Sequence, residues 1–281
     1  MSSAAPPPGF PDMNRIVGAM DIAMLVFDSL RYDTAVRALA AGATPNLAQL
    51  LPPAGWEERE TPGNFTLPAH LAFFSGFLPT PVHDHRASRP LALRFEGAHT
   101  TSAHTCVFDG VPDVVAGLAS RGHRTICIGG VQFFNQLNPL GKILPGLFEE
   151  AHWQPAFGAT SPDSTARQVA LARDRLAARP ARLPVFLYIN ISATHAPHGH
   201  YLPGTPDDSV ESQMAALAYA DSCLPPLLAA LRARGSCFMW LLGDHGDAYG
   251  EDGRVGHRHS HPVVMRVPYA HVVFNPFASV R

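Results

Sequence analysis

The chain has little of three features that would each point to a class of protein. None of its apolar runs reaches the roughly 18 to 20 residues that cross a bilayer, so we expect no membrane span. The formal net charge is only −2, which argues against a general nucleic-acid-binding protein. The four cysteines have no CxxC spacing, and we expect buried thiols rather than zinc ligands or disulfides.

The remaining composition is that of a globular protein with small-molecule partners. Of the 281 residues, 46% are apolar and 16% are charged, which provides enough apolar material for a sizeable core. The first residues are rich in Ser, Ala and Pro without the pattern of a signal peptide. We therefore expect residues 1–15 to be a disordered lead-in and residues 16–281 to form a single domain. A cytoplasmic location follows as the default.

Apolar runs alternate with helical patterns along most of the chain. Apolar runs typical of buried strands occupy residues 22–27, 124–128, 184–191 and 237–242. Helical patterns occupy residues 33–41, 44–51, 65–77, 111–120, 163–178 and 208–234, the last divided or kinked by Pro225 and Pro226. Strand–helix–strand crossovers keep neighbouring strands parallel. The predicted fold class is α/β, with a mostly parallel central sheet and helices on both faces.

Polar side chains follow three of the predicted strands. Asp28 follows the first strand, His195 comes after the third, and Asp244 and His245 follow the last. The carboxyl ends of parallel strands meet at one edge of the sheet, where open α/β sheets bind ligands. Carboxylate and imidazole groups suit Zn²⁺ or Mn²⁺, with Mg²⁺ or Ca²⁺ as alternatives. The sequence therefore predicts a divalent metal site at this edge. Thr66 lies at the start of the helix predicted at residues 65–77.

Three blocks of sequence occur in a recognisable order. They comprise residues 26–33 with a Thr-Pro-Asn segment at 44–46, residues 66–70 with Ser-Gly at 75–76, and residues 243–246 with 250–253 and 256–257. In this order they resemble the alkaline phosphatase and sulfatase superfamily of metallohydrolases, and in particular its short, stand-alone, sulfatase-like bacterial hydrolases. The resemblance spans about residues 22–268. It implies the alkaline phosphatase-like fold without the C-terminal subdomain of sulfatases.

The resemblance also implies a ligand set and a nucleophile. The metal would be held by Asp28, Asp244, His245 and the hydroxyl of Thr66, with one site expected and a second as an alternative. Thr66 would be the nucleophile, because a divalent cation favours the ionised form of a hydroxyl that is otherwise a poor nucleophile. Residues Glu251 and Asp252 of the same loop are candidates to orient ligand histidines.

Several histidines are candidates for contact with the substrate. His195 and His257 would bind the transferred group, stabilise charge on its oxygens, or act as the acid for the leaving group. His70 follows Thr66 by one helical turn and is expected to reach the substrate. Further histidines cluster with these in sequence, and they are either solvated loop residues or ligands of a second metal: His198, His200, His259 and His261.

Departures from the superfamily pattern narrow the predicted function. Thr66 and His70 stand where formylglycine sulfatases have Cys or Ser and then Arg, which places the chain nearer to the phosphoethanolamine and lipoteichoic-acid transferase branch. We therefore predict a metal-dependent hydrolase of a phosphate or phosphonate ester. The alternatives are a phospho-group transferase of the phosphoethanolamine-transferase type, a sulfate ester hydrolase, or a non-catalytic anion-binding member. The expected partner is a small phosphate, phosphonate or sulfate ester, without nucleic acid or membrane.

Overall fold

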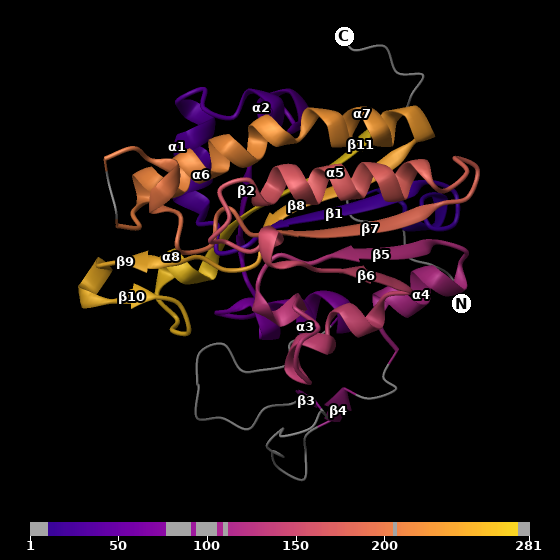
Figure 1. Cartoon of the computed structure of the whole chain (residues 1–281), viewed down its shortest axis with the longest axis horizontal. Coiled ribbons are helices and arrows are strands. Elements are labelled where there is room, and N and C mark those ends of the chain that lie inside the picture. Colours follow the sequence, from indigo (N-terminus) through magenta and orange to yellow (C-terminus); the bar gives the residue numbers. More distant parts are fainter. Residues whose placement is uncertain (1–10, 77–90, 94–105, 109–111, 205–206, 275–281) are drawn as a thin grey trace.

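The centre of the protein is a seven-stranded sheet in the order β2-β11-β8-β1-β7-β5-β6 (Figure 1). The computed structural model describes residues 11–76, 91–93, 106–108, 112–204 and 207–274. The strands of this sheet are β1 (Asp21–Phe27), β2 (Glu57–Glu60), β5 (Arg124–Ile128), β6 (Glu150–His152), β7 (Val185–Ile191), β8 (Cys237–Gly243) and β11 (Arg266–Phe274). Two small pairs are separate, parallel β3 (Leu91–Leu93) with β4 (Cys106–Phe108) and antiparallel β9 (Ala248–Tyr249) with β10 (Val255–Gly256).

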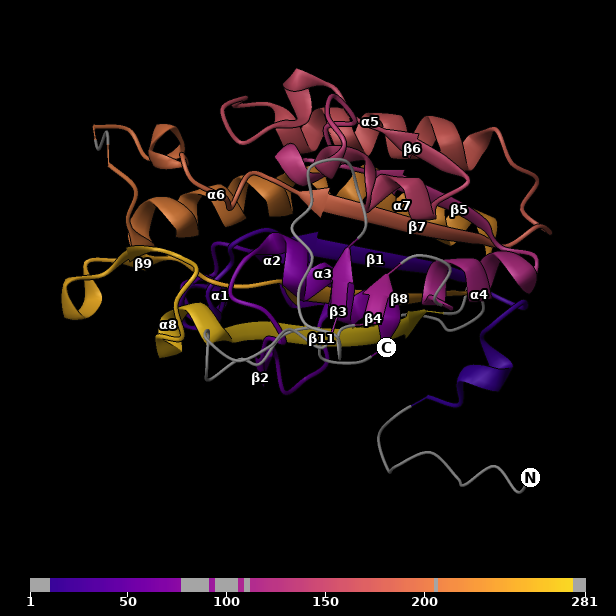
Figure 2. The ribbon, with the colours of Figure 1, turned by 90° about the horizontal axis from the view of Figure 1, so that it is seen from below.

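The predicted parallel sheet is confirmed, with an antiparallel edge that the sequence did not reveal. Strand β1 runs parallel to both β7 and β8, and β5 runs parallel to β7 and β6. Strand β11 is antiparallel to β8 and to β2, so the last strand returns along the edge. The five parallel strands consequently end at one edge of the sheet. The β9–β10 hairpin projects beyond that edge in both views (Figures 1 and 2).

Helices cover both faces of the sheet, as predicted. One face carries α1 (Tyr32–Ala40), α2 (Pro45–Leu50), α5 (Ser164–Ala177), α6 (Val210–Cys223) and α7 (Pro225–Arg234). The other face carries α3 (Thr66–Ser75) and α4 (Val114–Ser120), seen in front of the strands in Figure 2. Helix α8 (Pro262–Met265) precedes β11. Single 3₁₀ turns are η1 (Met13–Arg15), η2 (Gln132–Phe134), η3 (Leu140–Lys142), η4 (Pro145–Leu147), η5 (Pro155–Phe157), η6 (Gly199–Tyr201) and η7 (Glu251–Gly253).

The alternation of side chains along β1 divides the core into two layers. Leu25 and Phe27 pack with the helices of the α5–α7 face, whereas Met24 and Val26 pack with α3 and α4. Successive side chains of a strand point to opposite faces, so a strand buried on both sides is a continuous apolar run. Every residue of β1 is buried. This burial fixes the strand register and thereby the position of Asp28 at its end.

Helices α6 and α7 follow one another almost without interruption. Together they form a 25-residue segment, Val210–Arg234, that is long and apolar enough to cross a membrane by length and composition alone. Its apolar side chains also pack in the core, where Leu217, Leu227 and Leu231 are fully buried against the sheet. We therefore assign the segment to the core, and the expected absence of membrane contact stays a prediction. The predicted division occurs where α7 begins at Pro225.

Two smaller expectations concern the N-terminus and the cysteines. Part of the predicted lead-in is folded, because Asp12 accepts a hydrogen bond from the Asn14 amide and caps η1. Residues 1–10 lie outside the described part. Of the cysteines whose side chains are described, Cys127 and Cys237 are buried free thiols, in agreement with the prediction, whereas Cys223 is a free thiol that is only partly buried.

Candidate metal centre

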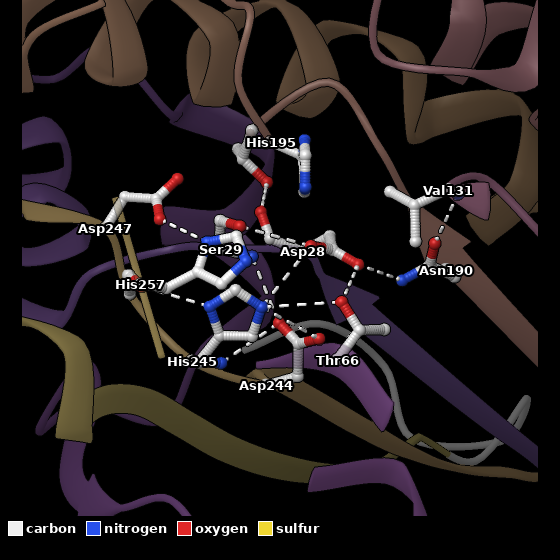
Figure 3. Close-up of polar contacts among 12 residues, drawn as sticks. Asp28, Ser29, Thr66, Val131, Asn190, His195, Asp244, His245, Asp247 and His257 are labelled. Atoms are coloured by element: carbon white, nitrogen blue, oxygen red, sulfur yellow. Dashed lines mark hydrogen bonds and ion pairs between the residues drawn. The ribbon is translucent and has the colours of Figure 1, made fainter. Parts of the chain in front are cut away.

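Four side chains predicted as ligands lie together at the carboxyl edge of the sheet (Figure 3). Asp28 follows β1, Asp244 and His245 follow β8, and Thr66 is the first residue of α3. The Thr66 hydroxyl lies 3.4 Å from Asp28 Oδ2 and 3.4 Å from His245 Nε2. His245 Nε2 lies 3.7 Å from both Asp28 Oδ1 and Asp244 Oδ2. Neighbouring parallel strands β1 and β8 thus bring together residues more than 200 positions apart.

The two carboxylates are buried without a cationic side chain between them. Asp28, Asp244 and His245 are each 0% exposed, and Asp244 Oδ2 has no hydrogen-bond partner within the described residues. Burial and the neighbouring Asp28 raise the pKa of Asp244 well above its usual value. Burial also acts to raise the pKa of Asp28, but the imidazoles of His195 and His245 outweigh it and hold the pKa below its usual value. A buried pair of carboxylates requires a positive charge to balance it, and the side chains described between these two do not supply one.

The backbone of the segment that follows β8 orients the ring of His245. Its Nδ1–H donates to the Gly246 carbonyl at 3.0 Å, which leaves Nε2 as the unprotonated nitrogen. Burial lowers the pKa of His245 to about 4, so the ring is neutral at pH 7. Only glycine fits at position 246, where the backbone passes close to Val263, because a Cβ there would lie 2.0 Å from the Val263 carbonyl oxygen. The loop therefore presents an imidazole nitrogen with a free lone pair.

These donors fit a divalent cation. Asp28, Asp244 and His245 offer ligand atoms that all lie within 4.8 Å of one another. Tetrahedral donors around Zn²⁺ are about 3.3 Å apart, given Zn–N and Zn–O distances of about 2.0 Å, which is close to the separations of 3.4 and 3.7 Å here. The unpartnered Asp244 oxygen is the atom that a cation would satisfy. Mixed carboxylate and imidazole ligation suits Zn²⁺ or Mn²⁺.

Two residues that support Asp28 were not identified from the sequence. Asn190, on β7, donates from Nδ2 to Asp28 Oδ2 at 2.8 Å, while its Oδ1 accepts from the amides of Gly130 and Val131. Those two amides determine which way the carboxamide faces. Ser29 donates from its hydroxyl to Asp28 Oδ1 at 3.2 Å and from its amide to Asp244 Oδ1 at 3.0 Å. A polar Asn inside an apolar strand was the available sequence signal.

His195 and His257 lie beside the predicted ligands, as Figure 3 shows. The ring of His257 is centred 4.5 Å from the ring of His245 and 6.0 Å from that of His195. His257 donates from Nδ1 to Asp247 Oδ1 at 2.6 Å, and His195 donates from Nδ1 to the Ala196 carbonyl at 2.5 Å. In both rings Nε2 is left without a partner among the described residues. Asp247 is therefore an orienting carboxylate that sequence reasoning missed.

His70 lies behind the site rather than in its opening. The ring is 0% exposed, donates from Nδ1 to the Thr66 carbonyl at 2.7 Å and accepts at Nε2 from the Tyr188 hydroxyl at 2.5 Å. Burial lowers the pKa of His70 to about 4, so it is neutral at pH 7. Both nitrogens are occupied by the protein. This placement fits support of the first turn of α3, and it does not fit the predicted contact with substrate.

Some other histidines and acids of the loops have contacts that differ from those predicted. His198 is fully buried, between the hydroxyls of Ser212 and Tyr249, so the expectation of a solvated residue or a metal ligand was wrong for it. Glu251 pairs with Arg31 rather than with a histidine of the site. Asp252 contacts His261 at 3.2 Å, away from the four predicted ligands. Asp247 is the acid of this loop that bonds a histidine beside the four predicted ligands, His257.

A buried glutamine from α6 holds two strand ends together. Gln213 donates from Nε2 to the carbonyl of Ser29 at 2.8 Å and to the carbonyl of Thr194 at 3.1 Å. The loop after β1 carries Asp28, and the loop after β7 carries His195. Gln213 is 0% exposed, so its amide group has no competing water contact. Gln213 of α6 thus sets the position of these two loops relative to each other.

Of the comparisons with known proteins, only the one with solved structures found similar proteins. No protein-family model matches the chain, and no curated protein sequence matches it. The zinc-bound C-terminal periplasmic domain of EptC from Escherichia coli is similar with a TM-score of 0.61 and 12% identity, over 92% of this chain and 74% of that one. The corresponding domain of the phosphoethanolamine transferase EptC from Campylobacter jejuni has a TM-score of 0.57 and 12% identity, over 91% and 79%.

A third similar structure carries a superfamily description. A protein in the alkaline phosphatase superfamily from Vibrio parahaemolyticus has a TM-score of 0.55 and 17% identity, over 92% of this chain and 61% of that one. Both EptC structures are periplasmic domains, which differs from the predicted cytoplasmic location, and that location stays a prediction. Structural similarity at such low sequence identity establishes the fold alone. The chain has the fold of the alkaline phosphatase superfamily, as the order of its motifs predicted.

Proposed function

We propose that the protein is a metal-dependent hydrolase of a phosphate or phosphonate ester and that Thr66 is its nucleophile. The observation that carries this proposal is the position of the Thr66 hydroxyl, 3.4 Å from Asp28 Oδ2 and from His245 Nε2. A hydroxyl held among metal-type ligands is placed for covalent catalysis. The comparison supports phosphorus as the reacting centre, because one similar structure is named a phosphoethanolamine transferase.

The surroundings of Thr66 favour a negative charge on its oxygen. Thr66 begins α3, where free backbone amides and the helix dipole stabilise an anion. A divalent cation held by Asp28, Asp244 and His245 would add the charge that lowers the pKa of the hydroxyl and polarises the ester. Thr66 Oγ1 then forms a bond to phosphorus while the bond to the leaving alcohol oxygen breaks. Attack by water on the same phosphorus breaks its bond to Thr66 Oγ1, releases the phosphate or phosphonate, and restores the Thr66 hydroxyl.

His257 and His195 are placed to handle the charge of the reacting group. Because Asp247 accepts the Nδ1 proton of His257, the ring turns Nε2 away from that carboxylate and keeps it available for a substrate oxygen. His195 has the same arrangement through the Ala196 carbonyl. We assign to these Nε2 atoms, when they carry a proton, the binding of phosphoryl oxygens and the transfer of that proton to the leaving alcohol oxygen.

The proposed cofactor is one Zn²⁺ or Mn²⁺ ion per chain. A second group, His245, Asp247 and His257, also has ligand atoms within 4.8 Å of one another. Asp247 and His257 of this group already bond each other at 2.6 Å, and His245 belongs to both groups. A single site at Asp28, Asp244 and His245 is therefore the proposed arrangement.

The first test is turnover of a nitrophenyl ester panel by the wild-type protein and by Thr66→Ala and Thr66→Ser. The panel contains a phosphate monoester, a phosphate diester, a phosphonate monoester and a sulfate ester, each with Zn²⁺, Mn²⁺, Mg²⁺ or Ca²⁺. We expect metal-dependent release of nitrophenol from a phosphorus ester, lost by roughly a thousandfold in Thr66→Ala and partly kept in Thr66→Ser. Preference for the sulfate ester, or unchanged turnover in a folded Thr66→Ala variant, contradicts the proposal.

Transfer of the phospho group to an acceptor alcohol is the second candidate. Its support is the name of the Campylobacter jejuni neighbour, since both reactions share the covalent Thr66 step and differ in what attacks next. Product analysis with and without an added alcohol separates them. A transferase would accumulate phosphorylated Thr66, detectable by mass spectrometry, until the acceptor is added, whereas a hydrolase releases phosphate throughout.

A further inference from the structure

The β9–β10 hairpin presents residues of the site but does not belong to the central sheet. Asp247 directly precedes β9 and His257 directly follows β10, and the two strands form a separate two-stranded sheet. The hairpin projects beyond the carboxyl edge of the central sheet (Figures 1 and 2). The hydrogen-bond ladder of the central sheet therefore does not set the position of His257 relative to His195, and side-chain contacts must do so.

A hydroxyl of the hairpin is bonded to the loop that carries His195. The Tyr249 hydroxyl lies 2.8 Å from His198 Nε2, and the two rings meet edge to face with their centres 5.6 Å apart. His198 follows His195 by three residues in the loop after β7 and is 0% exposed. This contact joins the segment that presents His195 directly to the hairpin that presents His257.

The hydrogen bonds around His198 determine which nitrogen carries the proton. The Ser212 hydroxyl donates to the Ser209 carbonyl at 3.1 Å, so it accepts from Nδ1 of His198 at 2.9 Å. Nε2 is then unprotonated and accepts from the Tyr249 hydroxyl. Burial lowers the pKa of His198 below its usual value, which keeps the ring neutral at pH 7. Asp208 Oδ1 accepts from the His198 amide at 2.6 Å, so the backbone at this position is held as well as the ring.

Arg31 provides a second hold on the hairpin that does not involve the Tyr249 hydroxyl. Its guanidinium carbon lies 5.4 Å from the centre of the Tyr249 ring, and its Nη1 donates to the Asp247 carbonyl at 3.3 Å. The same nitrogen pairs with Glu251 at 2.5 Å. Arg31 lies in the loop after β1 and is 3% exposed. Loss of the Tyr249 hydroxyl would therefore leave the hairpin attached to the loop after β1 and free it only from the loop that carries His195.

We propose that Tyr249 and His198 are positioning residues that fix the distance between the rings of His195 and His257, so that both rings act on one phosphoryl group. The centres of those two rings lie 6.0 Å apart. Misplacement of a catalytic group by about 1 Å can cost about a hundredfold in rate. This inference rests on the proposed function for its kinetic consequence, since that function assigns the proton of the leaving alcohol to these two rings.

The test uses variants that remove hydrogen-bonding atoms and keep a ring. Tyr249→Phe removes the hydroxyl that bonds His198. Tyr201→Phe is the matched control, because Tyr201 is also half-buried and its hydroxyl donates to the Ser161 carbonyl at 3.3 Å. His198→Phe keeps a ring without nitrogens, whereas His198→Gln provides an amide oxygen that can accept from the Tyr249 hydroxyl.

The first measurement is kcat/KM for two phosphate monoesters with different leaving groups, phenyl phosphate and 4-nitrophenyl phosphate. We expect Tyr249→Phe to lose about tenfold on phenyl phosphate and about threefold or less on 4-nitrophenyl phosphate, because the better leaving group needs less protonation. His198→Phe should show the same difference, and His198→Gln should recover part of it. Tyr201→Phe should change neither value. Equal losses on both esters, no loss, or the same loss in Tyr201→Phe overturns the inference.

A binding measurement separates positioning from a general loss of structure and needs no turnover. Inorganic phosphate is titrated by calorimetry into the zinc-loaded wild type, Tyr249→Phe, His257→Ala and the double variant. We expect Tyr249→Phe to weaken the Kd about fivefold in the wild type and less than about twofold once the His257 ring is absent, since the hydroxyl acts through that ring.

The same titration distinguishes failure of this inference from failure of the hydrolase proposal. If neither ester is turned over but the effect of Tyr249→Phe depends on His257, the hydrolase proposal fails and the positioning role stands. If Tyr249→Phe weakens phosphate binding by the same factor with and without the His257 ring, the role is structural and the inference is overturned. Absence of phosphate binding by the zinc-loaded wild type overturns it as well.

Discussion

Strand β1 carries a buried carboxylate at each end, and the two ends have different surroundings. At its start, Asp21 accepts from Nε of Arg234 at 2.7 Å and from the amide of Val185 at 2.8 Å. Arg234 in turn donates to the carbonyls of Leu176, Arg179 and Leu183. Every group of this cluster has a partner from the chain itself. The cluster ties α5 and α7 to the amino edge of the sheet.

At the other end of β1 the chain supplies a second carboxylate instead of a cation. Asp28 faces Asp244 across a neutral His245, and one oxygen of Asp244 lacks a partner among the described groups. An unpaired buried carboxylate costs several kcal/mol of stability unless its charge is balanced. The amino edge is thus complete without a ligand, whereas the carboxyl edge lacks the positive charge that the proposed cation would supply.

The largest expected effect is loss of metal affinity in Asp244→Asn. Removing one charged ligand should weaken Zn²⁺ binding by about a thousandfold or more, because a change outside the ligand shell already costs 10- to 100-fold. The folded-state pKa of Asp244 is raised, so its ionisation costs stability as the pH rises above its usual value of 3.8. Metal-free Asp244→Asn should therefore be more stable than the metal-free wild type at pH 8. Chelator competition and thermal unfolding measure the two effects, and a less stable metal-free variant would contradict the account.

The opposite pattern is expected at the amino edge. Arg234→Met removes the partner of a buried carboxylate and should lower the free energy of unfolding by about 3 to 5 kcal/mol. Metal affinity of the folded fraction should stay within about threefold of the wild type, since the change lies at the far end of β1. Denaturant titration and chelator competition on the same preparation check this. A large loss of affinity with unchanged stability would reverse the assignment of the two ends.

Asn190→Ala should have an intermediate effect. It removes the hydrogen bond to Asp28 Oδ2 and leaves the amides of Gly130 and Val131 without their acceptor. We expect metal affinity to fall by about 10- to 100-fold, less than in Asp244→Asn. Ser120→Ala serves as the control, because its hydroxyl bonds only its own helix at the surface. Affinity equal to that of the control would show that Asn190 acts on packing alone.

The smallest expected effect is a pH dependence of metal binding. Asp244 has a raised pKa and must lose its proton to bind a cation, whereas His245, with a pKa of about 4, is already neutral above pH 6. Zn²⁺ affinity should therefore rise with pH, by at most about tenfold per unit, until Asp244 is ionised in the metal-free protein. Calorimetry in buffers of different ionisation enthalpy counts the protons released. Uptake of protons, or affinity that falls with pH, would contradict this assignment.

The ends of the strands could be predicted from the sequence, because a strand buried on both faces is a continuous apolar run. An apolar run followed by Asp28, or by Asp244 and His245, marks both a strand and the edge where it ends. The start of α3 at Thr66 was likewise predicted from its Thr-x-Pro entry and is confirmed. Strand β11 was missed because its burial pattern is irregular and one of its two partners, β2, lies far away in sequence.

Supporting contacts could not be predicted because they depend on side-chain direction. His70 follows Thr66 by one turn, which allowed either an outward or an inward ring, and tertiary packing against Tyr188 turns it inward. Asp247, Glu251 and Asp252 were equivalent acids in one loop until the hairpin geometry placed Asp247 against His257. The sequence pattern therefore identifies the candidate ligands, and the packing of the loops determines what orients them.

The most direct test is the position of a bound metal. Crystals of the zinc-loaded protein, measured on both sides of the zinc absorption edge, locate the ion by its anomalous signal. We predict one strong peak per chain, about 2.0 to 2.2 Å from donor atoms of Asp28, Asp244 and His245, with the Thr66 hydroxyl also in contact. A chain that binds zinc elsewhere, with no peak between Asp28 and Asp244, would contradict the central claim that a cation completes this edge of the sheet.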